Sequence, residues 1–102
     1  MQRGRIWQKI KQILIEDGWQ IRFWKKPHIL AGLTDWSDKV IYLNPYAQYR
    51  IEETLLHEGL HILLPYAEEE VIEAFGRAIY EQMTQQEIGE LLGHIEALKI
   101  RR

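Results

Sequence analysis

The chain has 102 residues, of which 46% are hydrophobic and 27% charged, and its formal net charge is −2. This composition is typical of a globular protein, and the length predicts one domain over residues 1–102. No apolar run approaches the ~20 residues that cross a bilayer, and the basic N-terminus is not followed by a segment typical of a secretory signal. The absence of cysteine excludes disulfides and thiolate metal sites. Together these features favour a soluble, cytoplasmic protein without a membrane span.

The charge is unevenly distributed along the chain. Residues 1–28 contain seven basic and two acidic side chains, a local charge of +5, whereas residues 50–90 have a local charge of −8. A basic segment of this kind could contact nucleic acid or acidic lipid. It contains no recognised nucleic-acid-binding motif, and a solvated face that complements acidic segments of the same fold is the simpler interpretation. We therefore expect no nucleic-acid partner.

The first half of the sequence predicts one helix followed by three short strands. Residues 3–17 carry apolar side chains at helical spacing, and Gly18 is typical of a C-terminal cap. Polar and apolar residues then alternate, or β-branched and aromatic residues cluster, in three segments. These segments predict strands over residues 19–24, 28–34 and 39–43.

The second half predicts three helices. Their expected ranges are residues 49–64, which end before Pro65, residues 68–83, and residues 85–99, which follow the capping-box pattern of Thr84. The complete order is therefore an N-terminal helix, a small three-stranded sheet and three further helices. This order predicts an α+β fold.

The helix predicted over residues 49–64 contains the pattern H-E-x-x-H, at His57, Glu58 and His61. Residues four apart on a helix lie about 40° apart around the axis and one turn apart in height, so both imidazoles can reach one metal ion. Glu58 can touch a water on that metal without being a ligand. Most of the remaining helix surface is apolar, so this polar wedge is costly unless a metal or hydrogen bonds satisfy it. We predict a metal site; the alternative is a chance match.

Catalytic zinc usually takes three protein ligands, and the acidic residues after Pro65 can supply the third. A helical wheel of residues 68–83 places Glu69 and Glu73 on the border of the apolar face. We predict Glu69 as the third ligand and Glu73, one turn later, as a carboxylate that could orient a histidine. The alternative is that acidic residues here favour a helix N-terminus, which is our interpretation of Glu68 and Glu70.

Two motifs carry a resemblance to a known family: His57-Glu58-x-x-His61 and, on the next predicted helix, Glu69-x-x-x-Glu73-Ala74-Phe75. With them the chain resembles the gluzincin metallopeptidases. It looks most like the minigluzincins, soluble minimal forms similar to the catalytic domains of integral-membrane metallopeptidases. The resemblance covers about residues 29–83. The family usually has Asp where this chain has Glu73.

The resemblance implies one zinc ion bound by His57, His61 and Glu69, with no other cofactor. It implies hydrolysis of peptide bonds in a peptide or protein substrate, with Glu58 as general base and acid. The substrate would lie extended along an edge strand of the sheet. The candidate segment comprises Ile29, Leu30, Ala31, Gly32, Leu33 and Thr34, in which Gly32 is expected to let another backbone come close.

Three points stay open at this stage. The donor that stabilises the developing oxyanion could be Tyr49, Tyr66, Tyr80 or His94. Family members of this size can be latent, and the predicted helix over residues 85–99 could cover the cleft or belong to the core. The alternative function is a non-catalytic zinc-stabilised binding domain, or a zymogen-like protein blocked by its own C-terminal segment. The sequence leaves the oligomeric state open.

Overall fold

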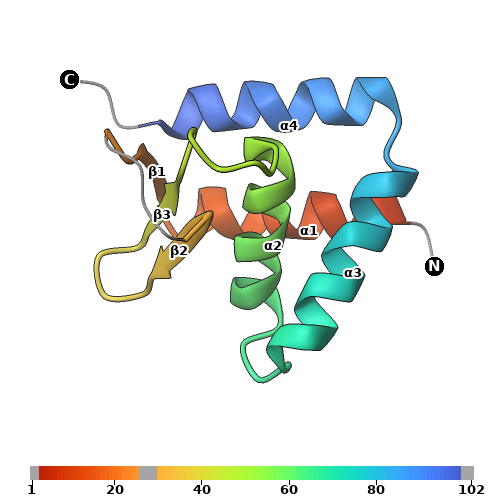
Figure 1. Cartoon of the computed structure of the whole chain (residues 1–102), viewed down its shortest axis with the longest axis horizontal. Coiled ribbons are helices and arrows are strands. Elements are labelled where there is room, and N and C mark those ends of the chain that lie inside the picture. The colour runs from red at the N-terminus through yellow and green to blue at the C-terminus, as the bar shows by residue number, and fades with distance from the viewer. Residues whose placement is uncertain (1–2, 26–29, 100–102) are drawn as a thin grey trace.

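The computed structural model describes residues 3–25 and 30–99 and has an α+β fold (Figure 1). Its elements, in chain order, are α1 (Arg3–Glu16), β1 (Gln20–Phe23), β2 (Gly32–Asp35), β3 (Val40–Leu43), α2 (Ile51–Leu63), α3 (Glu69–Gln82) and α4 (Gln85–Leu98). The predicted order of one helix, three strands and three helices is confirmed. Within the described part of the chain, no helix is both long and apolar enough to span a membrane.

Two of the predicted helix caps are confirmed. Gly18 has a φ of 72°, and the N–H groups of Gly18 and Trp19 bond the carbonyls of Ile15 and Leu14, which is the Schellman arrangement that ends α1. At the start of α4 the Thr84 hydroxyl accepts from the Glu87 N–H at 3.1 Å. These short-range patterns could be read from the sequence because both partners lie within one turn of each other.

The second strand differs most from its prediction. It begins at Gly32 and ends at Asp35, one residue beyond the predicted range of 28–34, whereas residues 28 and 29 lie outside the described residues. The Asp35 carboxylate accepts from the N–H groups of Ser37 and Asp38, both at 3.1 Å, and closes the β2–β3 turn. The bond from the Asp38 N–H, followed by one that the Ser37 hydroxyl donates at 3.0 Å, holds the pKa of Asp35 below its ordinary value. One aspartate thus serves both as the last strand residue and as the turn residue.

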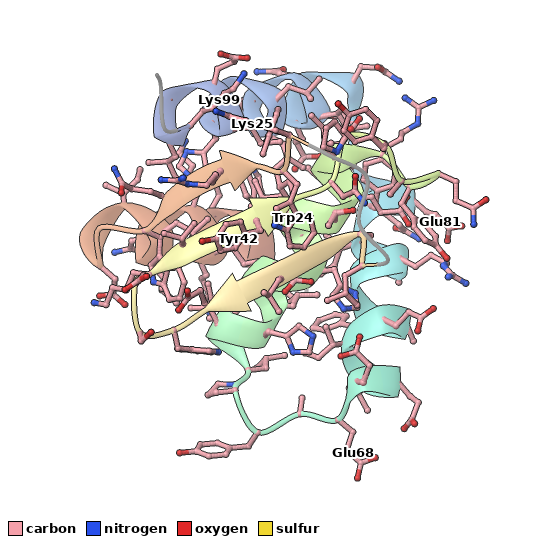
Figure 2. The ribbon with its side chains drawn as sticks, turned by 60° about the vertical axis from the view of Figure 1, so that its left-hand side comes forward. Trp24, Lys25, Tyr42, Glu68, Glu81 and Lys99 are labelled. Carbon is pink, nitrogen blue, oxygen red and sulfur yellow. The ribbon has the colours of Figure 1, made fainter. Side chains whose placement is uncertain are left out.

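The sheet is mixed, with strand order β1-β3-β2. β1 runs parallel to β3, and β2 runs antiparallel to it. Ile21 and Ile41 are neighbours in register and fully buried, whereas Leu33 pairs with Tyr42, which stacks against Trp24 on the other face (Figure 2). The outer edge of β1 meets Lys99 through a bridge at Ile21. β2 lies at the opposite edge.

Helix α2 lies in the middle of the molecule and packs against α1, α3, α4, β2 and β3 (Figure 1). Leu55, Leu56 and Leu60 are fully buried on it, as expected from its apolar surface. Helix α4 contributes Leu91 and Ile95 to the same core. Of the two positions considered for the 85–99 helix, the structure shows the one in the core.

Gly59, inside the H-E-x-x-H pattern, lies where α1 crosses α2. A Cβ at this position would come 2.5 Å from the Cγ2 of Ile10, which is buried in the core. We expect Gly59→Ala to lower the free energy of unfolding by about 1–3 kcal/mol, because the branched side chain cannot move away without disturbing its neighbours. Urea unfolding followed by tryptophan fluorescence would measure it.

Matched variants separate this clash from a general effect of the substitution. Gly89→Ala on α4 meets nothing within 4 Å and should be neutral or stabilise by up to about 1 kcal/mol. Adding Ile10→Leu to Gly59→Ala moves the branch away from Cβ and should recover part of the loss, whereas Ile10→Val keeps Cγ2 and should not. Wild-type stability of Gly59→Ala would disprove the close crossing.

Candidate metal centre

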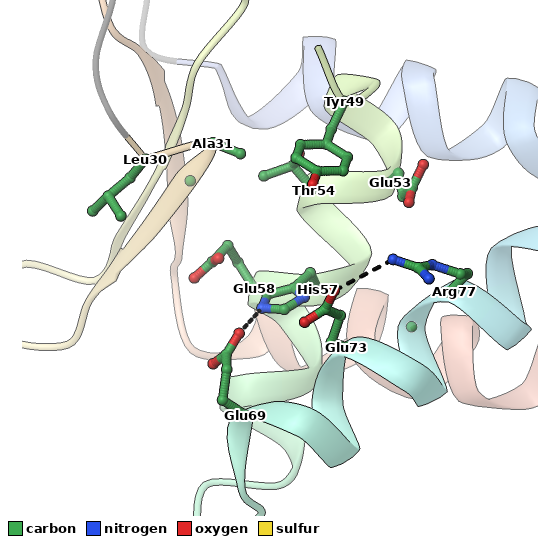
Figure 3. Close-up of a pocket in the computed structure, with 12 residues that line it drawn as sticks. Leu30, Ala31, Tyr49, Glu53, Thr54, His57, Glu58, Glu69, Glu73 and Arg77 are labelled. Atoms are coloured by element: carbon green, nitrogen blue, oxygen red, sulfur yellow. Dashed lines mark hydrogen bonds and ion pairs between the residues drawn. The ribbon is translucent and has the colours of Figure 1, made fainter. Parts of the chain in front are cut away.

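The turn between α2 and α3 brings three predicted ligands together. The Glu69 carboxylate lies against both imidazoles, with Oε1 2.7 Å from the Nε2 of His57 and Oε2 2.9 Å from the Nε2 of His61. The two Nε2 atoms are 3.3 Å apart (Figure 3 shows His57 and Glu69). α3 packs directly on α2 here, since a Cβ at Gly76 would lie at ordinary contact distance, 3.8 Å, from the Cα of His57. Both helices therefore direct their donors to one point.

The donor set fits a zinc ion. One ligand atom from each of the three residues lies within 4.8 Å of the other two. Tetrahedral zinc with Zn–N bonds of 2.0–2.1 Å requires two nitrogen ligands to be separated by about 3.3 Å, which is the separation of the Nε2 atoms here. Two imidazoles and one carboxylate are also a ligand set of catalytic zinc, which leaves a fourth position open. The predicted group of His57, His61 and Glu69 is thus assembled as a candidate metal site.

The site is more accessible than the sequence suggested. The side chains of His57 and His61 are each 26% exposed and that of Glu69 is 61% exposed, although we expected a deep polar wedge in α2. The reason is that β2 and α3 approach α2 from two sides and leave the surface between them open to solvent. A ligand or substrate can therefore reach the three residues directly.

Glu58 is held by the sheet beside the three candidate ligands His57, His61 and Glu69, which we call the metal group. The residue is only 8% exposed, and its Oε1 accepts a hydrogen bond from the Oγ1 of Thr34 at 2.7 Å. Figure 3 shows Glu58 on the strand side of His57, near Glu69. Thr34 was predicted only as part of a substrate-binding segment. Its bond to Glu58 could not be predicted, because the two residues lie 24 positions apart and meet only through tertiary packing.

A cleft of about 270 Å³ lies between β2 and α3, and two of the three candidate ligands, His57 and Glu69, line it together with Glu58, whereas His61 does not. Leu30, Ala31 and Gly32 form one wall, and residues of α2 and α3 form the floor and the other wall (Figure 3). Leu33 and Thr34 were also predicted for substrate binding but do not line the cleft: Leu33 pairs with Tyr42 in the sheet, and the Thr34 side chain bonds Glu58. Ile29 lies outside the described residues. Helix α4 supplies none of the lining residues among those described.

Gly32 has a different role from the one expected. A Cβ there would lie 2.5 Å from the Cγ2 of Thr54 and 3.2 Å from the Cγ of Glu58. The space beside Gly32 is therefore filled by α2 of the same chain rather than kept for another backbone. The absence of a side chain lets β2 lie close enough to α2 for Thr34 to reach Glu58.

The edge of β2 next to the cleft has its backbone groups turned outward at alternate residues. The Asn44 N–H bonds the Ala31 carbonyl at 2.9 Å, and antiparallel pairs alternate between bonded and non-bonded positions. Gly32 and Thr34 therefore direct their N–H and C=O groups toward the open edge. An extended chain added to this edge would form backbone hydrogen bonds with Gly32 and Thr34, the two residues on the face of β2 that lies against α2.

Glu73 lines the cleft, but its side chain bonds Arg77 and not a histidine. The Arg77 Nη2 donates to the Glu73 Oε1 at 3.3 Å, on the same helix (Figure 3). Within residues 3–25 and 30–99, the structure shows no hydrogen bond from Glu73 to His57 or His61. The predicted orienting role is therefore not seen in this arrangement.

Three of the four candidate oxyanion donors lie away from the cleft. The Tyr80 hydroxyl donates to the Oε2 of the buried Glu52 at 3.2 Å, and burial, followed by the charge of Glu52, raises the pKa of Tyr80. His94 is buried on α4, which lowers its pKa, and Tyr66 is 98% exposed in the α2–α3 turn. Tyr49 is the candidate that lines the cleft.

Comparisons with protein-family models, with curated proteins and with solved structures find no match to this chain. A functional assignment must therefore be built from the residues of the cleft. The strongest feature is the combination of a candidate metal-binding group with a buried carboxylate beside the sheet.

Proposed function

We propose that the protein is a zinc-dependent metallopeptidase of the gluzincin type, most like the minigluzincins, that hydrolyses peptide bonds in peptide or protein substrates. The observation that carries the proposal is the convergence of His57, His61 and Glu69 on one point beside the buried Glu58. A purely structural metal site does not need a protected carboxylate next to it. A peptidase needs one as its proton carrier.

The chemistry divides between the metal and the chain. When bound, zinc supplies Lewis acidity that lowers the pKa of water toward neutrality and polarises the scissile carbonyl. Glu58 accepts the proton of the attacking water and passes it to the leaving nitrogen. Among the residues that the structure describes, the Thr34 hydroxyl bonds Oε1 of Glu58 and no side chain bonds Oε2, so the carboxylate is fixed and Oε2 is left to receive the proton. Low exposure keeps this proton away from bulk water.

We further propose that the substrate binds as an added strand along β2. The outward N–H and C=O groups of Gly32 and Thr34 support this mode, because a strand that bonds them lies beside Thr34, whose hydroxyl holds Glu58. Methylation of the backbone nitrogen at alternate substrate residues, outside the scissile bond, should reduce kcat/KM at least about tenfold. Methylation at the intervening residues, whose N–H groups point away from β2, should have little effect. Equal cleavage of both peptides would exclude strand addition.

The experiment that tests the proposed function measures zinc by elemental analysis and cleavage of casein in the same samples of wild-type protein. We expect one zinc per chain and cleavage that a chelator abolishes and added zinc restores. Zinc without cleavage would favour the alternative, a zinc-stabilised binding domain or a latent form. Absence of zinc after the metal is supplied would refute both.

A further inference from the structure

The cleft continues beyond the metal group into an acidic compartment. Glu53 lies one helical turn before His57 on α2, and Glu73 lies one turn after Glu69 on α3. Both line the cleft, and Arg77 is the basic residue among the lining residues that the structure describes. Figure 3 shows Glu53 and Arg77 on the side of His57 that lies away from Leu30. The wall next to the metal group therefore carries charges that the hydrolytic step does not use.

These charges do not cancel. Arg77 bonds Glu73, so that pair is close to neutral. Within the described residues Glu53 has neither an ion pair nor a hydrogen bond, although its side chain is partly buried. A carboxylate in a partly enclosed cleft acts on a ligand more strongly than one on open surface, because water screens it less. The half-exposed ring of Tyr49 lines the same end and offers an aromatic face to a cation.

We propose that this compartment selects substrates with a lysine or arginine side chain close to the scissile bond, and that Glu53 is the main specificity-determining residue. One helical turn is about 5.4 Å and an extended chain advances about 3.3 Å per residue, so the cation belongs within about two residues of the cleaved bond. This inference rests on the proposed peptidase function, because it names the substrate class of the same cleft.

The test compares peptides that differ only in lysine or norleucine at one position, for the two positions on each side of the scissile bond. Wild-type protein should prefer lysine by about 5- to 30-fold in kcat/KM at one of these positions, and the ratio should fall as salt is raised. Glu53→Gln should bring the ratio toward about 1. Glu53→Lys should reverse the preference in favour of a glutamate peptide.

Two further variants distinguish a charge effect from a structural one. Arg77→Gln releases Glu73 from its ion pair and should raise the lysine preference, a direction that simple damage to the cleft would not produce. Glu70→Gln removes the same charge from an exposed position on α3 that does not line the cleft, and its ratio should match wild type. An identical ratio in wild type and Glu53→Gln would overturn the inference.

A binding measurement separates failure of this inference from failure of the proposed function. The same labelled peptides are titrated against the Glu58→Gln protein and followed by fluorescence anisotropy. If zinc-loaded wild type cleaves no peptide, the peptidase proposal fails, and the lysine-to-norleucine ratio of Kd values decides the specificity alone. Tighter lysine binding that is lost in Glu53→Gln/Glu58→Gln would sustain the acidic compartment. Equal Kd values would reject it.

Discussion

Replacing Glu58 with Gln should reduce peptide hydrolysis by at least about 10³-fold while the protein still binds one zinc per chain. The amide has the same shape as the carboxylate, and its oxygen can still accept the hydrogen bond from Thr34. It cannot take a proton from water, so only the proton transfer is lost. Measurement of kcat/KM and of zinc content on the same preparation would show this separation.

The matched control for this variant is Glu90→Gln, which makes the same substitution at an exposed position on α4 outside the cleft. It should retain both zinc and activity. Unfolding of the two variants in urea would show whether the loss in Glu58→Gln comes from damage to the fold. Turnover within a few-fold of wild type in Glu58→Gln would remove Glu58 from the mechanism.

The second large effect is expected for Glu69→Ala, which should weaken zinc binding by at least about 10²-fold. Loss of a partner that merely supports a ligand costs 10- to 100-fold in affinity, so loss of a ligand itself should cost no less. The side chain is 61% exposed, and its contacts in the structure are with the two site histidines. The fold should therefore survive. Competition with a chelator of known affinity would measure the change, and circular dichroism would check the helices.

Glu70→Ala is the control for this experiment, since it removes the neighbouring exposed acid of α3 without touching either histidine. It should bind zinc as wild type does. Unchanged zinc affinity in Glu69→Ala would show that the third ligand lies elsewhere. Glu73, one turn further along α3 in the same cleft, would then be the first residue to test in a double variant.

The metal group could be predicted because its geometry is local. His57 and His61 are separated by one turn of one helix, so their proximity follows from helix geometry alone. Glu69 lies on the next helix, and it was singled out because it falls on the border of that helix's apolar face, where a side chain faces the neighbouring helix. In each case the position of the side chain follows from helical periodicity within a single element, and this periodicity can be read from the sequence.

The residues that hold Glu58 could not be predicted, because they meet across the fold. Thr34 reaches Glu58 only when β2 lies at the edge of the sheet and close to α2. Local sequence patterns predict neither the strand order nor the distance between β2 and α2. Gly32 was noticed, but its neighbour was misidentified, since an empty side-chain position does not say which element fills it. The same limit applies to Tyr80, whose hydroxyl is directed to Glu52 by the packing of α3 on α2.

Metal binding places no requirement on the two x positions of the H-E-x-x-H pattern, Gly59 and Leu60. In this chain, packing against neighbouring helices constrains both residues. Gly59 has Ile10 of α1 against it, and Leu60 extends its Cδ1 toward Gly76 of α3. Transplanting the motif onto a helix of another scaffold would therefore move the ligands without the backbone spacing that aligns them. A working graft must also carry complementary positions from two further helices, which makes the transferable unit a three-helix crossing rather than five consecutive residues.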